Sequence, residues 1–211
     1  MSGPTQEDEK ALEDWVKVKP ITPEQKLFLA DIRGKLPALE TFFCTRKPFP
    51  SKRLQATFGR ECILAEYPFS GIKNPIKPAS EPMRELMEEY AKAVGVPIEC
   101  VMAHVNIYPA GTAAGCGAHQ DLEHVDQTKD IWGFQWGGAA DLCVWQGDPK
   151  EAAKRAGAKL RVTADDVYIF QAGMQEVASH AVKRKKSDDE RGNITLRVCK
   201  IEPPRKRARI A

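Results

Sequence analysis

Two residues in the middle of the chain, His119 and Asp121, have the types and the spacing to hold a metal ion. They lie in the stretch GTAAGCGAHQDLEHVD, residues 111–126. A non-haem Fe(II) centre of the facial-triad type uses two histidines and one carboxylate and leaves other coordination positions open. A His-x-Asp triplet is common by chance. The pair therefore indicates a metal site only if the chain supplies a second histidine.

His180 is the histidine best placed to complete such a triad. The chain has four histidines, and neither His104 nor His124 has an obvious place in the pattern. His180 follows the apolar segment DVYIFQ at residues 166–171 and precedes a strand-like pattern near the C-terminus. The order of motifs is therefore a His-x-Asp triplet, several strands and a single histidine.

The pattern after His180, RGNITLRVCK at residues 191–200, carries the residues that could bind an anion. Arg191, Asn193 and Arg197 alternate with apolar residues, so they share one face of a strand. That face is either exposed to solvent or turned into a barrel, where an arginine fork would hold a carboxylate through two hydrogen bonds. Together with the three candidate metal ligands, the pattern favours a metal site that takes a dicarboxylate co-substrate.

Composition limits the class of protein. The chain of 211 residues is 42% hydrophobic and 29% charged, which suits one globular domain. No apolar run approaches the roughly 20 residues of a membrane span, so no membrane partner is expected. The N-terminus lacks the basic-then-apolar order of a secretory signal, and the six cysteines form no CxxC pair. We therefore expect an intracellular protein with reduced thiols, and a monomer.

The elements that must position these residues are mostly strands. Capping and spacing signals predict helices over residues 22–36 and 80–94, and a short one after Pro149. Strands are predicted over residues 101–108, 140–145, 160–163, 166–171 and 191–200. In the first of these, His104, Asn106 and Tyr108 share a face. The pattern is typical of an α+β, mainly β fold, a jelly-roll or barrel core buttressed by N-terminal helices.

The two ends of the chain differ in charge from the centre. Residues 1–20 are acidic and are expected to form a flexible N-terminus, with a single domain over residues 21–201. Residues 202–211 form a basic tail, EPPRKRARIA, which is rich in proline and arginine. The tail is an import signal, an arm that contacts phosphates, or a solvated terminus. An import signal would place the protein in the nucleus.

In combination, these motifs resemble the AlkB-like family of Fe(II)- and 2-oxoglutarate-dependent dioxygenases. The resemblance extends from about Pro50 to Lys200. The matching pieces are LQATFG (54–59), YPFSG (67–71), NIYPAG (106–111), HQD (119–121), the single His180 and RGNITLR (191–197). The last piece is the most specific, because the closing strand of that family has the form Arg-x-Asn-x-Thr-x-Arg. The resemblance implies a double-stranded β-helix, which is a jelly-roll.

The resemblance also implies a role for each matching residue. His119, Asp121 and His180 would bind Fe(II), with 2-oxoglutarate and O2 as co-substrates. Residues on two neighbouring strands would hold 2-oxoglutarate: Asn106, Tyr108, Arg191, Asn193 and Arg197. The implied reaction is oxidative demethylation, in which a hydroxylated N-methyl group leaves as formaldehyde.

The family acts mainly on N-alkylated bases in DNA or RNA, and some members act on protein. Residues 50–71 correspond to the segment that covers the substrate in the family. Phe58, Tyr67 and Phe69 are candidates to stack on a base, or else pack in the core. The best-known repair members have an acidic residue directly after the metal-binding aspartate. This chain has Leu122 there, and an acid only at Glu123.

Three functions are therefore open. The first is demethylation of a nucleic acid, which would be the partner and substrate. The second is a dioxygenase of the same fold that acts on a protein side chain or a small molecule. The third is a nucleic-acid-binding module without enzymatic activity, and the complete set of metal-ligand candidates is evidence against it.

Overall fold

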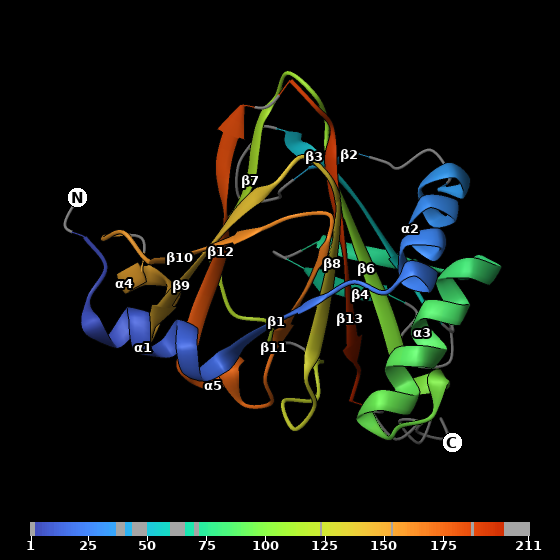
Figure 1. Cartoon of the computed structure of the whole chain (residues 1–211), viewed down its shortest axis with the longest axis horizontal. Coiled ribbons are helices and arrows are strands. Elements are labelled where there is room, and N and C mark those ends of the chain that lie inside the picture. Colours follow the sequence, from blue (N-terminus) through green and yellow to red (C-terminus); the bar gives the residue numbers. More distant parts are fainter. Residues whose placement is uncertain are drawn as a thin grey trace, which may run out of the picture.

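Two β-sheets face each other in the molecule, and the longer helices cover them from outside (Figure 1). The computed structural model describes residues 3–36, 41–43, 50–59, 66–69, 72–122, 124–152, 154–186 and 188–200. The basic tail of residues 202–211 lies outside the described residues. Among the described helices, none is both long enough and apolar enough to cross a lipid bilayer.

Helices alternate along the chain with single strands or runs of strands. The helices are α1 (Gln6–Trp15), α2 (Pro23–Lys35), α3 (Glu81–Val94), η1 (Ile98–Cys100), α4 (Pro149–Ala152) and α5 (Met174–Val177). The first strands are β1 (Val16–Pro20), β2 (Thr41–Phe43), β3 (Pro50–Phe58), β4 (Glu66–Phe69), β5 (Ile72–Lys77) and β6 (Val101–Tyr108). The remaining strands are β7 (Ala113–His119), β8 (Ile131–Gly137), β9 (Ala140–Gln146), β10 (Ala158–Val162), β11 (Asp166–Phe170), β12 (Ala178–Lys186) and β13 (Arg191–Val198).

The larger sheet contains nine strands in the order β1-β11-β8-β13-β6-β3-β5-β4, and β2 pairs with β3. The smaller sheet contains four strands in the order β10-β9-β12-β7. Apart from the parallel pair β3–β5, the strands pair antiparallel. The predicted fold class, a mainly β jelly-roll buttressed by helices, is confirmed.

Strands β6 and β13 lie side by side and turn their polar residues to the same face. Their antiparallel register pairs Asn106 with Asn193, and Tyr108 with Arg191. The intervening apolar residues, among them Val105 and Ile194, are buried in the main hydrophobic core. Because side chains alternate along a strand, this one register turns both predicted polar faces toward the smaller sheet.

Helices α2 and α3 pack against each other and cover the outer, apolar face of the larger sheet (Figure 1). Helix α2 begins with a reciprocal capping box between Thr22 and Gln25, as predicted. Helix α3 buries one stripe of residues and ends at Gly95, which has a left-handed φ of 69°. Tyr90 from this stripe meets Trp132 of β8 edge-on, with ring centroids 5.5 Å apart.

The expectation of a flexible N-terminus is wrong for residues 6–20. Helix α1 packs against β9 of the smaller sheet, and β1 adds an edge strand to the larger sheet by pairing with β11. The segment is held by Asp8, which is fully buried. Its carboxylate accepts hydrogen bonds from Arg155 Nη2 at 2.6 Å, Arg155 Nε at 3.0 Å and the Gln146 amide at 2.9 Å. The acidic composition predicted a segment exposed to solvent, but the Asp8 carboxylate is buried and hydrogen-bonded within the protein.

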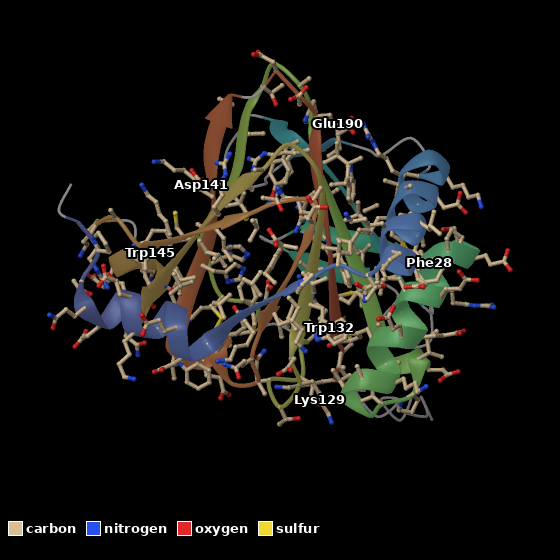
Figure 2. The ribbon with its side chains drawn as sticks, viewed as in Figure 1. Phe28, Lys129, Trp132, Asp141, Trp145 and Glu190 are labelled. Carbon is tan, nitrogen blue, oxygen red and sulfur yellow. The ribbon has the colours of Figure 1, made fainter. Side chains whose placement is uncertain are left out.

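The excursion between β9 and β10 is held on the outside of the smaller sheet. Trp145 lies there beside α4, away from the larger sheet (Figure 2), and its Nε1 donates to the Arg155 carbonyl oxygen. Trp145, Cys143, Ala152 and Ala181 form a small separate apolar cluster. The predicted short helix after Pro149 is confirmed as α4, and it lies on this outer face.

Because Gly133 in β8 has no side chain, the ring of Tyr168 can lie directly over this strand. The two residues are register partners, and a Cβ atom on Gly133 would lie 1.9 Å from Tyr168 Cζ. The Tyr168 hydroxyl accepts a hydrogen bond from Asn193 Nδ2 at 3.1 Å. Tyr168 is thereby directed into the space between the sheets.

We predict that Asp8→Asn destabilises the fold by about 1–3 kcal/mol at neutral pH, since it removes the buried carboxylate that accepts from the half-buried Arg155 and from the Gln146 amide. Burial raises the pKa of Asp8, but the hydrogen bonds from Arg155, Thr5 and Gln146 together bring it below the ordinary value of 3.8. A lowered folded-state pKa stabilises the protein above pH 3.8, and this stabilisation is lost as the pH falls through the folded-state pKa. Urea unfolding at neutral and acidic pH measures both effects.

The matched control for this prediction is Asp14→Asn, since Asp14 pairs with Lys10 on the exposed side of the same helix. Its cost should stay within about 0.5 kcal/mol. Equal costs for the two variants, or a cost for Asp8→Asn that does not shrink in acid, would contradict the role assigned to Asp8.

We predict that Gly133→Ala destabilises the fold by about 1–3 kcal/mol, because the new methyl group overlaps the Tyr168 ring. Tyr168→Phe keeps the ring and removes only the hydroxyl group, so it should cost less. Thermal unfolding of both variants compares the two effects. A Gly133→Ala variant as stable as the wild type would show that the ring moves aside without cost.

Candidate metal centre

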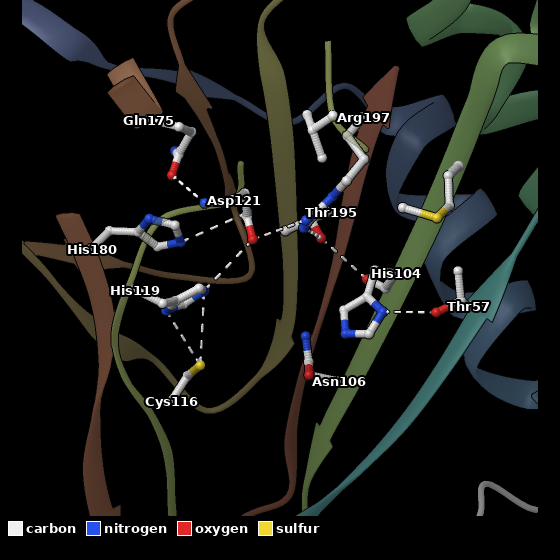
Figure 3. A network of polar contacts seen from close by, with 12 residues as sticks. Thr57, His104, Asn106, Cys116, His119, Asp121, Gln175, His180, Thr195 and Arg197 are labelled. Atoms are coloured by element: carbon white, nitrogen blue, oxygen red, sulfur yellow. Dashed lines mark hydrogen bonds and ion pairs between the residues drawn. The ribbon is translucent and has the colours of Figure 1, made fainter. Parts of the chain in front are cut away.

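The structure brings His119, Asp121 and His180 together between the two sheets (Figure 3). His119 ends β7, Asp121 follows in the next loop, and His180 lies opposite His119 in the neighbouring strand β12. His119 Nε2 is 3.8 Å from Asp121 Oδ1, and His180 Nε2 is 3.9 Å from Asp121 Oδ2. One candidate ligand atom from each residue lies within 4.8 Å of the other two.

Asp121 is an ionised carboxylate in a buried position. Its side chain is 4% exposed, and Arg197 Nη1 lies 3.0 Å from its Oδ1. Burial by itself raises the pKa of this carboxyl group, but Arg197 and the two histidines hold the pKa well below its usual range. The residue that would contribute the negative charge to a metal site is therefore charged across the physiological range.

The two histidines have different electrostatic surroundings. Burial, together with the charge of His119, lowers the pKa of His180 to about 3, so its imidazole is neutral and has a free lone pair. Burial also acts to lower the pKa of His119, but Cys116 and Asp121 outweigh it and raise the pKa to about 9. A cation bound at this site has to displace the second proton of His119.

The donor set fits a divalent metal ion. His119 Nδ1 lies 2.8 Å from the Gly117 carbonyl oxygen. A carbonyl can only accept, so Nδ1 carries a proton and Nε2 is the nitrogen left to coordinate a metal. Two imidazoles and one carboxylate on one side of a cavity are the ligands of a facial triad. This arrangement could hold Fe(II).

The triad faces a cavity that encloses about 410 Å³, part of it open to solvent. Polar side chains from both sheets dominate its lining. The lining residues are Arg53, His104, Asn106, Tyr108, Cys116, His119, Asp121, Leu142, Tyr168, His180, Val182, Asn193, Thr195 and Arg197. Four of the five residues predicted to hold 2-oxoglutarate, Asn106, Tyr108, Asn193 and Arg197, therefore share one cavity with the three candidate metal ligands.

The fifth predicted residue, Arg191, lies directly behind this lining. Its guanidinium group stacks over the Tyr108 ring, 4.3 Å from the ring centroid. Its Nη2 atom donates to the Ala114 carbonyl oxygen at 2.9 Å, which ties β13 to β7 of the smaller sheet. In this structure Arg191 therefore supports Tyr108 and joins the sheets.

The cavity also contains residues that the sequence motifs did not indicate. His104 is 3% exposed and contacts Thr57 Oγ1 through Nδ1 at 3.0 Å. Burial, with Arg197 and Arg53 nearby, lowers the pKa of His104 to about 3, so the ring is neutral. Its position two residues before Asn106, on the same strand face, is a signal that could have identified it. Arg53 of β3 had no such signal.

Cys116 lies next to the candidate ligand His119, with Sγ 3.6 Å from Nδ1. Burial alone would raise the pKa of this thiol, but His119 and Arg53 lower it to about 6. Cys116 lies three residues before His119 in the sequence, but only the pairing of β7 in its sheet brings the thiol into the cavity. The wall near His119 thus carries a thiol of thiolate character beside the guanidinium of Arg53.

Of the side chains expected to contact a base, the structure describes only one, that of Phe58. Phe58 is 3% exposed and packs in the main core, so its assignment as a stacking residue is corrected to core packing. Its register partner is Ala103, on the apolar face of β6. The side chains of Tyr67, Phe69 and Glu123 lie outside the described residues. Leu122, directly after Asp121, is 43% exposed.

The two tryptophans of β8 both contribute to the core. Trp136 is buried there, and Trp132 packs against its edge (Figure 2). Neither tryptophan is among the residues that line the cavity.

Of the comparisons with known proteins, only the one with solved structures bears on the fold. No family model matches the sequence, and no curated protein matches it significantly. Among solved structures, the chain is similar to the one described as "The structure of OsALKBH1", at a TM-score of 0.53 and 15% sequence identity. The match covers 87% of this chain and 96% of that chain. The chain therefore has the fold of an AlkB homologue.

Proposed function

We propose that this chain is an Fe(II)- and 2-oxoglutarate-dependent dioxygenase. The observation that carries the proposal is the His119–Asp121–His180 cluster, which shares one cavity with residues of the Arg-x-Asn-x-Thr-x-Arg strand. A metal site alone would fit many reactions, and an arginine strand alone would fit many anions. Their meeting in one enclosed space supports a metal ion together with a dicarboxylate co-substrate.

In this proposal, one side of the cavity binds the metal ion and the other binds 2-oxoglutarate. His119, Asp121 and His180 hold the metal on one side, and Arg197 keeps the Asp121 carboxylate ionised. The polar residues of β6 and β13 offer donors to the carboxylates of 2-oxoglutarate. They are Asn106, Tyr108, Asn193 and Arg197, with Arg191 supporting the Tyr108 ring. The buried walls exclude bulk water from the reacting groups.

Bound Fe(II) and 2-oxoglutarate supply the oxidising chemistry for activating O2. One oxygen atom of O2 ends in succinate, formed with CO2 from 2-oxoglutarate, and the other enters a C–H bond of the substrate. When that bond belongs to an N-methyl group, the resulting N-hydroxymethyl group breaks at its C–N bond. It releases formaldehyde and returns a proton to the nitrogen.

For the substrate, we propose an N-alkylated base in DNA or RNA. The fold of an AlkB homologue and the basic character of residues 202–211 support it. A cavity enclosed between two sheets would receive a base only from a single strand or after the base is flipped from its stack. We further propose an intracellular monomer, which the basic tail would direct to the nucleus or help to hold on nucleic acid.

One observation favours a second candidate, a dioxygenase that acts on a protein side chain or a small molecule. Leu122 places an exposed apolar side chain next to Asp121, where the best-known repair members of the resembling family have an acid. An apolar contact at this position suits a less polar substrate. The chemistry of the metal site would be the same.

We predict that the protein loaded with Fe(II) and 2-oxoglutarate, and then exposed to O2, releases formaldehyde and succinate together from an N-methylated single-stranded oligonucleotide. His180→Ala should abolish both products, because it removes one of three metal ligands. Both products are measured across a panel of methylated DNA and RNA oligomers. The control is Gln171→Ala, a surface change outside the cavity, which should retain activity.

The products of this assay distinguish between the two candidate functions. Equal amounts of the two products, lost in His180→Ala, support demethylation and name the preferred base. Succinate without formaldehyde across the whole panel overturns the nucleic-acid substrate and supports the second candidate. No product from the wild-type protein, with no iron retained, overturns the metal site.

A further inference from the structure

Asp121 lies beyond the last residue of β7, so sheet pairing does not hold its backbone. Two glutamine side chains bind it instead. The Asp121 amide donates to Gln175 Oε1 at 2.9 Å (Figure 3), and the Asp121 carbonyl oxygen accepts from Gln127 Nε2 at 2.7 Å. The Gln127 amide also donates to the Val125 carbonyl oxygen at 3.2 Å. Both peptide groups that flank the Asp121 side chain are therefore held by amides from elsewhere in the chain.

We infer that Gln175 and Gln127 form a clamp on the backbone of Asp121 that positions its carboxylate for metal binding. The inference rests on the metal site of the proposed function and adds two positioning residues to it. Neither glutamine belongs to the triad, so both act through Asp121.

The clamp is dry at Asp121 and Gln175, whereas Gln127 is half-buried. Asp121 is 5% exposed and Gln175 is 2% exposed. A buried amide that loses its partner cannot recover the hydrogen bond from water. The two hydrogen bonds therefore fix the orientation of the peptide planes on both sides of Asp121. The direction of the Asp121 side chain follows from that orientation.

The clamp also links Asp121 to the segment that leads to His180. Gln175 lies in α5, and β12 begins directly after that helix at Ala178. The Gln127 carbonyl oxygen accepts from the Gly173 amide at 2.8 Å, immediately before α5. Both arms of the clamp thus attach to one short segment. That segment sets the distance between the Asp121 carboxylate and the His180 ring.

The two glutamines have opposite roles, which makes the clamp testable. The Asp121 amide can only donate, so Gln175 must present oxygen, and its Nε2 has no partner among the described residues. The carbonyl oxygens of Asp121 and Val125 can only accept, so Gln127 must present nitrogen. Glutamate at position 175 keeps the required acceptor. Glutamate at position 127 replaces the required donor with an oxygen that faces two carbonyls.

The experiment measures the affinity of the full chain for Co(II), used as a spectroscopic probe, by competition with a chelator. Gln175→Met, Gln127→Met and Gln127→Glu should each weaken Co(II) binding by about 10- to 100-fold. Gln175→Glu should stay within about threefold of the wild type and keep its visible absorption spectrum. Thermal unfolding of each variant is recorded alongside.

The matched control is Gln25→Met. Gln25 is a buried glutamine, 4% exposed, that caps α2 outside the cavity. It should lower stability without changing Co(II) affinity. If a methionine variant of the clamp fails to fold, the pair Gln175→Glu and Gln127→Glu carries the test, because only the second loses a hydrogen bond.

The outcomes distinguish the clamp from the proposed function. A wild type that binds no Co(II) overturns the metal site, and the clamp with it. A wild type that binds Co(II), with clamp variants that bind equally well, overturns the clamp alone. Equal losses in Gln175→Glu and Gln127→Glu also overturn it, since the effect would then follow the added charge and not the hydrogen bond.

Discussion

The ion pair between Asp121 and Arg197 joins the two sheets at the centre of the molecule. Asp121 follows β7 of the smaller sheet, and Arg197 lies in β13 of the larger one. Both side chains are 4% exposed, so each charge has lost most of its water. Such a pair is tolerated only when further hydrogen bonds serve the remaining polar atoms. Thr195 accepts from Arg197 Nη2 at 2.6 Å, and the glutamines hold the Asp121 backbone.

The polar cavity between the sheets is possible because the main apolar packing lies elsewhere. The main core lies between the outer face of the larger sheet and helices α2 and α3. A second core gathers α1, β1 and α5 with parts of β8, β9 and β11. The main core stabilises the larger sheet from outside the cavity, and the second core borders the cavity at Leu142 and Tyr168. The space between the sheets can therefore hold charged and polar groups, which a single central core would exclude.

Much of the site could be predicted from spacing along single strands. Polar and apolar residues alternate in residues 103–108 and 191–198, and a strand turns every second residue to one face. This is why Asn106 and Tyr108 were expected to share one face and Asn193 and Arg197 another, whereas their joint role toward one co-substrate was implied by the family resemblance. The fold class followed from the same strands and from two helices with clear capping signals. The flexible N-terminus was a wrong prediction, although the alternation in Val-Lys-Val-Lys at residues 16–19 was a signal for β1.

Other parts could not be predicted, because they depend on pairing between distant segments. Strand β7 has the sequence AAGCGAH, and its glycines and alanines are poor strand formers. It is a strand because β12 pairs with it and sets His180 against His119. Arg53 and Cys116 belong to the cavity only through the positions of β3 and β7. Phe58 looked like a candidate for base stacking, but the pairing of β3 with β6 turns it into the core.

The sequence by itself determined the chemistry that this protein can hold: two histidines, a carboxylate and a strand of alternating arginines. Residue types and local periodicity are properties of the sequence, so they are known without knowledge of the fold. Only the tertiary structure decided that the Asp121 carboxylate is ionised, that His104 is neutral and that two glutamines hold Asp121. Apart from Gln127, which is 6 residues from Asp121, those properties depend on burial and on partners far along the chain, such as Gln175, which is 54 residues from Asp121. Burial, and contacts between residues far apart in the sequence, exist only in the folded protein, where the two sheets face each other.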